Sequence, residues 1–189
     1  SYDDPVETFT TNAIGSMNVL EATRGKESIQ SLVMITSDKA YKNVEWIWGY
    51  KEDDRLGGED PYSSSKGCAE LIFHSYVNSY FKDNDTLAKL ATARAGNVIG
   101  GGDWAKDRIV PDIVRSFSKD EVLSIRAPNA TRPWQHVLEP LSGYLTLAKM
   151  QIKKESLNHE SFNFGPRQDV NQNVLRLVEE FSKYWDSGS

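Results

Sequence analysis

The stretch Ser31–Tyr41, "SLVMITSDKAY", joins a run of apolar residues to a polar segment. Its first part, Ser31–Thr36, is short and almost continuously apolar, which is typical of a strand buried on both faces of a parallel sheet. The polar part, Thr36–Lys39, follows at once. Because ligands bind just beyond the carboxyl ends of the strands in open α/β sheets, the stretch predicts a sheet and a candidate site at its edge. An ordinary polar loop with Asp38 as a cap explains the pattern equally well at this point.

Helices and further strands are expected on both sides of this stretch. Asp4 and Pro5 predict a helix start, since Asp caps helices and Pro suits the first helical position, and Asp60-Pro61 repeats the pattern. Gly25 is expected to end the first helix. Strands and helices alternate along the chain, which predicts an α/β fold with a parallel sheet. The expected strands are 31–36, 90–95, 122–125 and 162–164, and the other expected helices are 109–117, 138–152 and 174–184.

The composition excludes several classes of function. The 189 residues are 39% hydrophobic and 26% charged, which is enough for one domain with a core. No apolar run approaches the roughly 20 residues of a membrane helix, and the net charge of −5 argues against nucleic acid as the main ligand. Cys68 is the only cysteine and the three histidines are scattered, so neither a disulfide nor a zinc site is expected. A cytoplasmic location is expected.

Tyr62 and Lys66 form a candidate acid/base pair. They lie four residues apart on the predicted helix that begins at Asp60-Pro61, so their side chains share a face. An ammonium group favours the phenolate and lowers a tyrosine pKa that is otherwise about 10. With eight tyrosines in the chain, an incidental pair on an exposed helix face is the simpler explanation of this spacing alone.

Three consecutive glycines, Gly100–Gly102, also follow a predicted strand. They lack the spacing of a dinucleotide-binding turn that leads directly into a helix. They suit a backbone path close to a ligand, flanked by Asn97 and Trp104. A loop that needs positive φ angles is the alternative, and it suffices for the glycines alone.

Arg126 and Arg132 are candidate ligands for a diphosphate, because a guanidinium group binds phosphate through two parallel hydrogen bonds. Exposed arginines without a ligand are the commoner outcome for such a pair.

Five motifs in fixed order resemble a known family. The chain carries "TSDKAY", "DPYSSSKGCAELI", "RAGNVIGGGDW", "RPWQHVLEPLSGYL" and "FNFGP". The series resembles the extended short-chain dehydrogenase/reductase family and, within it, the nucleotide-sugar 4,6-dehydratases. Members that act on glucose usually carry Thr-Asp-Glu after the first strand, where Ser37-Asp38-Lys39 stands here. That lysine, together with "NVEWIWGYKEDDRLGGEDPYS", is similar to the members that act on CDP-glucose.

The resemblance implies a Rossmann-like doubly wound parallel sheet and NAD as the cofactor. Residues 1–98 would be the C-terminal part of the NAD-binding domain. Residues 99–189 would be a mixed region, in which elements of a small, incomplete C-terminal substrate domain interleave with the last Rossmann elements. The Gly-rich strands that open the family are missing from this sequence, so an internal fragment is expected. The helices that begin at Asp4 and Asp60 resemble the family's dimer interface, which implies a homo-oligomer in the intact protein.

The resemblance also implies a role for individual residues. Tyr62 would take the proton of the sugar 4-hydroxyl while hydride leaves C4 for NAD, with Lys66 on the nicotinamide ribose and Ser37 on the reacting oxygen. Asp38 would act as the acid that helps the 6-hydroxyl leave, and Lys39 would be the base at C5. NAD contacts are implied for Thr36, Tyr62 and Lys66, and substrate contacts for Asn97, Trp104, Arg108 and Arg132.

The role of Lys39 makes a physical demand. A base must be neutral, yet a free lysine titrates near about 10.4. Burial, Lys66 and the nicotinamide cation would lower the pKa of Lys39, whereas ionised Asp38 would raise it. Asp38 and Lys39 are therefore expected to titrate as a coupled pair.

Two alternatives stay open on the sequence. An NAD-dependent epimerase or reductase that acts on another nucleotide sugar would share the fold, although Asp38 and Lys39 argue against an epimerase, which eliminates no water. A catalytically inactive, self-associating fragment is the other alternative. A 4-keto product formed from CDP-glucose and NAD would separate these possibilities.

Overall fold

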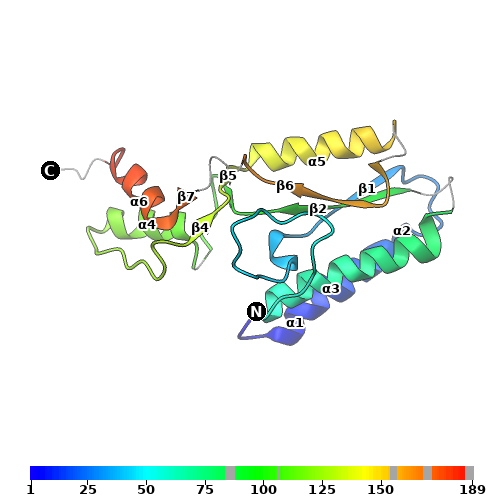
Figure 1. The fold of residues 1–189 in the computed structure, drawn as a ribbon, viewed down its shortest axis with the longest axis horizontal. Coiled ribbons are helices and arrows are strands. Elements are labelled where there is room, and N and C mark those ends of the chain that lie inside the picture. Colours follow the sequence, from blue (N-terminus) through cyan, green and yellow to red (C-terminus); the bar gives the residue numbers. More distant parts are fainter. Residues whose placement is uncertain (84–87, 106, 154–156, 168–171, 186–189) are drawn as a thin grey trace. The chain divides into compact units, whose positions relative to one another are not determined.

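The computed structural model describes residues 1–83, 88–105, 107–153, 157–167 and 172–185 (Figure 1). The chain forms two compact units. The first unit contains residues 1–96 and 139–164, and the second contains residues 97–138 and 165–189. From the sequence, residues 1–98 are assigned to the NAD-binding domain and residues 99–189 to a mixed region with substrate-binding elements. That assignment stays a prediction.

The first unit is built on a parallel sheet of three strands, β1 (Ser31–Ile35), β2 (Lys89–Ala95) and β6 (Glu160–Phe164), in the order β1-β2-β6. β1 and β6 both run parallel to β2. Parallel strands need crossover connections, which are usually helices, and helices do lie between these strands in the sequence. The α/β fold with a parallel sheet, as predicted from the sequence, is confirmed.

Helices cover both faces of this sheet. α5 (Leu138–Gln151) lies over one face, and α2 (Gly15–Thr23) and α3 (Pro61–Tyr76) lie over the other (Figure 1). The main hydrophobic cluster joins α2 and α3 to the strands, and burial of each large side chain in it contributes about 1.5–3 kcal/mol. Its buried members are Leu20, Met34, Phe73, Val77, Phe81, Ala88 and Leu90.

Both N-terminal caps predicted from the sequence are present. The Asp4 carboxylate accepts a hydrogen bond from the backbone N–H of Glu7 at 2.8 Å, at the start of α1 (Pro5–Phe9). The Asp60 carboxylate accepts one from the N–H of Ser63 at 3.0 Å, at the start of α3. Such caps satisfy backbone donors that have no partner within the helix. Gly25 ends the first helical segment with φ of +74°, as predicted.

The first helical segment is interrupted by a π-helical turn. α1 continues into Thr10–Ile14, which is π-helical, and then into α2. A second π-helical turn, Val77–Phe81, follows α3. Such turns insert a residue into a helix and rotate the side chains that follow. The sequence predicted one uninterrupted helix from Pro5 to Gly25, because the apolar spacing carries no signal for the inserted residue.

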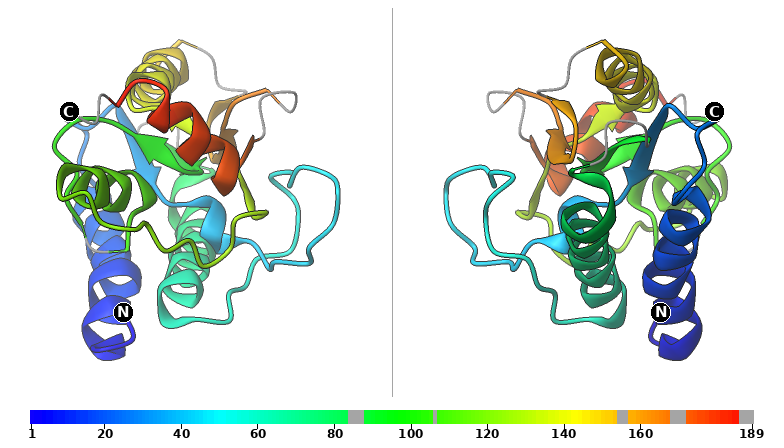
Figure 2. Two further views of the ribbon diagram at one scale, coloured as in Figure 1. Left: turned by 90° about the vertical axis from the view of Figure 1, so that its left-hand side faces the viewer. Right: turned by 90° about the vertical axis from the view of Figure 1, so that its right-hand side faces the viewer.

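The segment between β1 and α3 begins with a short 3-10 turn, Asp38–Ala40. Tyr41 then pairs with Leu56 in an isolated antiparallel bridge. The loop between them stands out from the sheet and helices of the first unit (Figure 2). Its exposed apolar side chains are Val44, Trp46, Ile47 and Trp48.

The second unit is held by short strand pairs and by aromatic contacts. Phe117 and Phe181 bring its two helices together, with ring centroids 6.3 Å apart, and Trp185 packs against both rings. The two helices are α4 (Ile109–Ser118) and α6 (Val174–Ser182), and the strand pairs are β3 (Val98–Ile99) with β5 (Gln135–His136), parallel, and β4 (Thr131–Arg132) with β7 (Gln172–Asn173), antiparallel.

Two expectations are wrong. Residues 122–125 form no strand, and Val122 is 97% exposed. The run comes shortly after the end of α4. Between them Asp120 adopts a positive φ of 56°, which turns the backbone out of the helix. β1 is not buried on both faces along its length, since Ile35 is 48% exposed. Among the described residues β1 has a hydrogen-bonded neighbour on one side only.

In the described part of the chain, no helix combines the length and the apolar character needed to cross a membrane.

Candidate active site

The predicted catalytic turn follows β1 directly. The backbone N–H of Thr36 donates to the carbonyl of Ala93 at 2.9 Å, which extends the pairing of β1 with β2 by one residue. The Ser37 hydroxyl accepts from the N–H of Lys39 at 3.2 Å and donates to the Asp38 carboxylate at 3.0 Å. Ser37 thus caps the 3-10 turn and links its hydroxyl to the neighbouring acid.

This turn packs against helix α3. The two elements approach each other at Gly67, where an added Cβ atom would be at ordinary van der Waals distance, 3.5 Å from the carbonyl oxygen of Ala40 and 3.6 Å from the nitrogen of Gly57. The N–H of Gly57 donates to the same Ala40 oxygen at 2.8 Å. The turn is therefore held between α3 and the returning end of the loop.

Tyr62 and Lys66 occupy the first turns of α3. The Lys66 amine lies 5.8 Å from the centroid of the Tyr62 ring, and the Tyr62 side chain is 39% exposed. Burial lowers the pKa of the Lys66 amine, and the negative charge of Glu70 opposes that shift. Tyr62 borders an open pocket of about 310 Å³, whose other lining residues are Ser1, Glu7, Thr8, Thr11 and Asn12.

The start of α3 is also coupled to the turn by charge. Burial favours the neutral form of Asp60, but hydrogen bonds from Ser63 and from the backbone N–H of Tyr62 outweigh it. With the Lys39 ammonium, they hold the pKa of this carboxyl below its usual value. Lys39 is thus close enough to stabilise the charge on the cap of the helix that carries Tyr62.

Asn12 connects the π-helical turn to the same helix. Its side-chain amide donates to the Ser65 hydroxyl at 2.9 Å, and that hydroxyl donates to the carbonyl of Tyr62 at 2.7 Å. π-Helical turns occur frequently at functional sites.

Six predicted site residues therefore lie in one region of the first unit, where the turn after β1 meets α3. Thr36 and the turn come from one element and Tyr62 and Lys66 from the other. The chemical roles assigned to these residues from the family resemblance stay predictions. In the described part of the chain, no group of three or more His, Cys, Asp or Glu side chains is arranged to hold a metal ion.

The four residues predicted to bind substrate lie in the second unit. The carbonyl of Asn97 accepts a hydrogen bond from the N–H of Gln135 at 3.0 Å. Arg108 is the residue that precedes the first turn of α4. Arg132 lies on β4, where its guanidinium group donates to the carbonyl of Thr131 at 2.7 Å.

Trp104, the fourth of these residues, is 60% exposed. The guanidinium group of Arg115 lies 6.0 Å from the centroid of its indole ring and donates to its backbone carbonyl. Arg115 also pairs with Asp112 at 2.9 Å. Trp104 is thus held against α4 by Arg115, and most of its side chain is exposed.

The glycine loop has two local reasons for its composition. A Cβ atom at Gly100 would lie 2.8 Å from a methyl group of Val137, so only glycine fits there without a shift. Gly102 has φ of +83°, a conformation that disfavours side chains. Packing and turn geometry account for Gly100 and Gly102, and a ligand contact by this loop stays a prediction.

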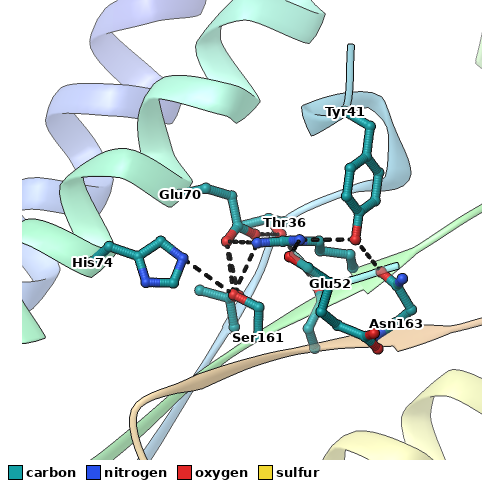
Figure 3. Close-up of polar contacts among 10 residues, drawn as sticks. Thr36, Tyr41, Glu52, Glu70, His74, Ser161 and Asn163 are labelled. Atoms are coloured by element: carbon teal, nitrogen blue, oxygen red, sulfur yellow. Dashed lines mark hydrogen bonds and ion pairs between the residues drawn. The ribbon is translucent and has the colours of Figure 1, made fainter. Parts of the chain in front are cut away.

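A buried ion pair lies beside the site and was missed by the sequence reasoning (Figure 3). Glu70 of α3 and Arg94 of β2 are 2.7 Å apart, with side chains 0% and 1% exposed. Burial alone would raise the pKa of Glu70, but Arg94 and the hydroxyls of Thr36 and Thr92 hold it below its usual value. The signal in the sequence is an arginine inside the apolar strand "KLATARA" and an acid four residues after Lys66.

The sequence matches a known family over most of its length. The profile of the NAD dependent epimerase/dehydratase family matches residues 1–165. The chain is 48% identical over 188 residues to the CDP-glucose 4,6-dehydratase of Salmonella typhimurium, which covers 98% of this chain and 52% of that protein. The chain thus spans about half the length of this relative.

Solved structures show the same fold. The dTDP-glucose 4,6-dehydratase of Bacillus anthracis, in complex with NAD, matches with a TM-score of 0.78 at 22% identity, over 93% of this chain and 52% of that chain. The UDP-N-acetylglucosamine 4-epimerase of Methanobrevibacter ruminantium, in complex with UDP-N-acetylmuramic acid, matches with a TM-score of 0.78 at 18% identity, over 96% and 55%. The Rossmann-like fold expected from the sequence is confirmed, and the chain belongs to the NAD dependent epimerase/dehydratase family.

Proposed function

We propose that the protein acts as a nucleotide-sugar 4,6-dehydratase, which converts CDP-glucose to CDP-4-keto-6-deoxyglucose with loss of water. The observation that carries this proposal is the packing of the Ser37–Lys39 turn against the helix of Tyr62 and Lys66. The 48% identity to the Salmonella typhimurium CDP-glucose 4,6-dehydratase supports the substrate. Dehydration needs an acid and a base besides the groups that manage the 4-hydroxyl, and this turn supplies two candidates.

The residues of the first unit suit the nicotinamide-ribose end of NAD. A phenol and a half-buried amine share one face of α3, and Tyr62 borders an open pocket. Hydroxyl groups of a ribose are good partners for an ammonium group, which donates three hydrogen bonds. When bound, NAD would accept hydride from C4 of the sugar and return it to C6. Lys66, Tyr62 and Thr36 are the residues that we assign to hold this end of the cofactor.

Tyr62, Lys66 and Ser37 would manage the first proton. Tyr62 accepts the proton of the 4-hydroxyl, and the Lys66 amine lies 5.8 Å from the centroid of its ring. Ser37 would orient the reacting oxygen with its hydroxyl.

Asp38 and Lys39 would carry out the elimination. Lys39 takes the proton from C5, which the 4-ketone has made acidic, and Asp38 gives its proton to the departing 6-hydroxyl. This step requires a protonated Asp38 and a neutral Lys39. Their adjacency in one turn supports that assignment.

The second unit would bind the nucleotide diphosphate. Arg132 is assigned to the phosphates, since guanidinium groups bind them through charge-assisted hydrogen bonds. Arg108 and Asn97 would add polar contacts, and the exposed ring of Trp104 would form a wall of the site.

The direct test is a product assay on the complete product of the gene, with any sequence encoded on either side of this chain. The protein is mixed with NAD and CDP-glucose, and the sugar product is identified by mass spectrometry and NMR. Loss of one water with a keto group at C4 is expected, and UDP-glucose and dTDP-glucose serve as controls for the base. A C4 epimer of the same mass as the substrate would instead identify an epimerase.

Two further assignments belong to this proposal. Self-association of the complete gene product, through the surface of α1 and α3, would fit the family resemblance, and light scattering tests it. A reducing cytoplasm suits a chain whose only cysteine is Cys68.

A further inference from the structure

The predicted catalytic turn is bracketed by one buried ion pair. The residue before the turn, Thr36, donates its hydroxyl hydrogen to the Glu70 carboxylate. The residue after the turn, Tyr41, accepts a hydrogen bond from the Arg94 guanidinium group at 2.8 Å. Each member of the pair thus holds one end of the segment that carries Ser37–Ala40 (Figure 3).

The pair is also anchored on β2, on β6 and on the loop after the turn. Glu70 accepts from Thr92 of β2 at 2.9 Å, and Arg94 donates to Ser161 of β6 at 2.9 Å. Arg94 also donates to the backbone carbonyl of Glu52 in the loop at 2.8 Å.

A second link runs from Tyr41 to β6. The Tyr41 hydroxyl donates to the side-chain carbonyl of Asn163 at 2.7 Å, and the side-chain amide of Asn163 donates to the carbonyl of Tyr50 at 2.9 Å. The rings of Tyr41 and Tyr50 stack with centroids 5.1 Å apart. The Arg94 guanidinium group lies 5.0 Å from the centroid of the Tyr41 ring, so Tyr41 is held by its ring as well as by its hydroxyl.

Such a pair is an expensive way to stabilise a fold. Taking two charges out of water costs several kcal/mol per ion, and well-packed apolar side chains often serve stability equally well or better. The best-supported use of a buried pair is to fix one arrangement of the elements that it joins. Here those elements are the turn, the sheet and α3.

We infer that Glu70 and Arg94 are positioning residues, which hold the Ser37–Lys39 turn in register with the Tyr62–Lys66 face of α3. The inference rests on the proposed function for its catalytic meaning, whereas the positioning itself is a property of the chain. Glu70 has a second effect in the same place. It lies one helical turn after Lys66 and favours the ammonium form of that residue. The titratable groups of this region include Tyr62, Lys66, Glu70 and His74 on α3, Asp60 at its start, Asp38, Lys39 and Tyr41 on the turn and its end, Glu52 on the loop, and Arg94 on β2.

The main test compares Tyr41→Phe with Tyr50→Phe in the complete gene product. Both changes remove one hydroxyl from the same stacked pair of rings. Tyr41→Phe removes the hydrogen bonds from the Tyr41 hydroxyl to Arg94 and Asn163. In the part of the chain that the structure describes, the Tyr50 hydroxyl bonds to the exposed segment at Asn43 and Val44. Hydrogen exchange followed by mass spectrometry reports on the backbone N–H groups of Ala40 and Tyr41, which bond within the turn at 3.0 and 3.3 Å.

We expect Tyr41→Phe to speed exchange in the turn about fivefold or more, because it removes the hydrogen bonds of the Tyr41 hydroxyl to Arg94 and Asn163. Exchange in β2 should stay unchanged. Turnover should fall about tenfold or more with little change in KM, since misplaced catalytic groups cost rate. Tyr50→Phe should change neither the exchange rate in the turn nor the turnover. The same exchange rate in the turn of both variants, or a uniform rise throughout the chain, would overturn the inference.

The effect of charge is tested by acylation of lysines, again without substrate. Glu70→Gln is expected to raise the rate at which Lys66 is acylated at pH 8 by roughly twofold or more, relative to the exposed Lys26. Glu21→Gln, which breaks the exposed ion pair with Arg24, is the matched control. An unchanged Lys66 rate in folded Glu70→Gln would refute the charge effect. If Glu70→Gln does not fold, the comparison of Tyr41→Phe with Tyr50→Phe tests the inference alone. Neither exchange nor acylation requires the proposed activity, so a failed product assay would leave these results interpretable.

Discussion

Gly58 lies directly against Ser63, the third residue of α3. A Cβ atom at Gly58 would be 2.2 Å from the Cβ of Ser63 and 2.5 Å from its backbone carbonyl carbon. The carbonyl of Gly58 also accepts a hydrogen bond from the Ser64 hydroxyl at 2.6 Å. The returning end of the loop is therefore in contact with the backbone that positions Tyr62.

This contact predicts a local effect of Gly58→Ala. The new methyl group must push the loop away from α3, and overpacking of this kind costs typically about 1–3 kcal/mol. Turnover should fall even though the protein stays folded, because the displaced backbone carries Tyr62. Gly49→Ala is the matched control, since a Cβ atom there would have no neighbour within 4 Å. Equal activity of the two variants would show that the contact does not matter for the site.

Lys39→Ala is predicted to stop dehydration after the first step. Without a base at C5 the 4-keto sugar should form, but no water should leave and no deuterium from heavy water should enter at C5. NMR of the sugar in single-turnover reactions measures both. Lys42→Ala, three residues on and exposed, is the control and should behave as the unmodified protein. Unimpaired elimination by Lys39→Ala would remove Lys39 from the mechanism.

Arg132→Ala should weaken the binding of CDP-glucose roughly 10- to 100-fold, the value of one charge-assisted hydrogen bond. Its effect on NAD should be small, because the cofactor is assigned to the first unit. Isothermal titration of each ligand measures the two affinities separately. Arg176→Ala, whose side chain pairs with Glu180 at 2.7 Å on α6, controls for loss of a positive charge. Equal losses for both ligands would contradict the assignment.

Acid is predicted to destabilise the protein through His74. Burial lowers the pKa of His74 in the folded protein, whereas an unfolded histidine titrates near about 6.5. Between these two pKa values the unfolded chain binds a proton that the folded chain does not, so the free energy of unfolding falls as the pH drops below about 6.5. His159 has the same sign, also through burial. Glu70, with its lowered pKa, adds its own loss only below about 4.3, where an unfolded glutamate protonates.

Urea unfolding between pH 5 and pH 8 measures this dependence. His74→Gln should flatten the fall below about pH 6.5, and the exposed His136→Gln on β5 should leave it unchanged. The opposite ranking of the two variants would show that another group causes the acid sensitivity.

Local signals in the sequence predicted the regular elements well. Asp4-Pro5 and Asp60-Pro61 begin helices because a carboxylate and a proline act on the nearest backbone groups. The apolar runs that became β1 and β2 fold as strands of a parallel sheet, since their alternation with helices allows few other arrangements. The polar residues after β1 were predicted to form a site because the carboxyl ends of parallel strands lie at one edge of the sheet.

The strand predicted at 122–125, the strand pairs of the second unit and the Glu70–Arg94 pair were decided only by the tertiary structure. A run of apolar residues becomes a strand only if a partner offers hydrogen bonds, and the two-residue strands at 98–99 and 135–136 find each other from 36 or more residues away. Glu70 and Arg94 meet across 24 residues, and each alone would be a costly buried charge. Local sequence thus predicted where α1 and α3 begin and which apolar runs form β1 and β2. Long-range packing decided which polar groups could be buried, because only folding brings their partners within hydrogen-bonding distance.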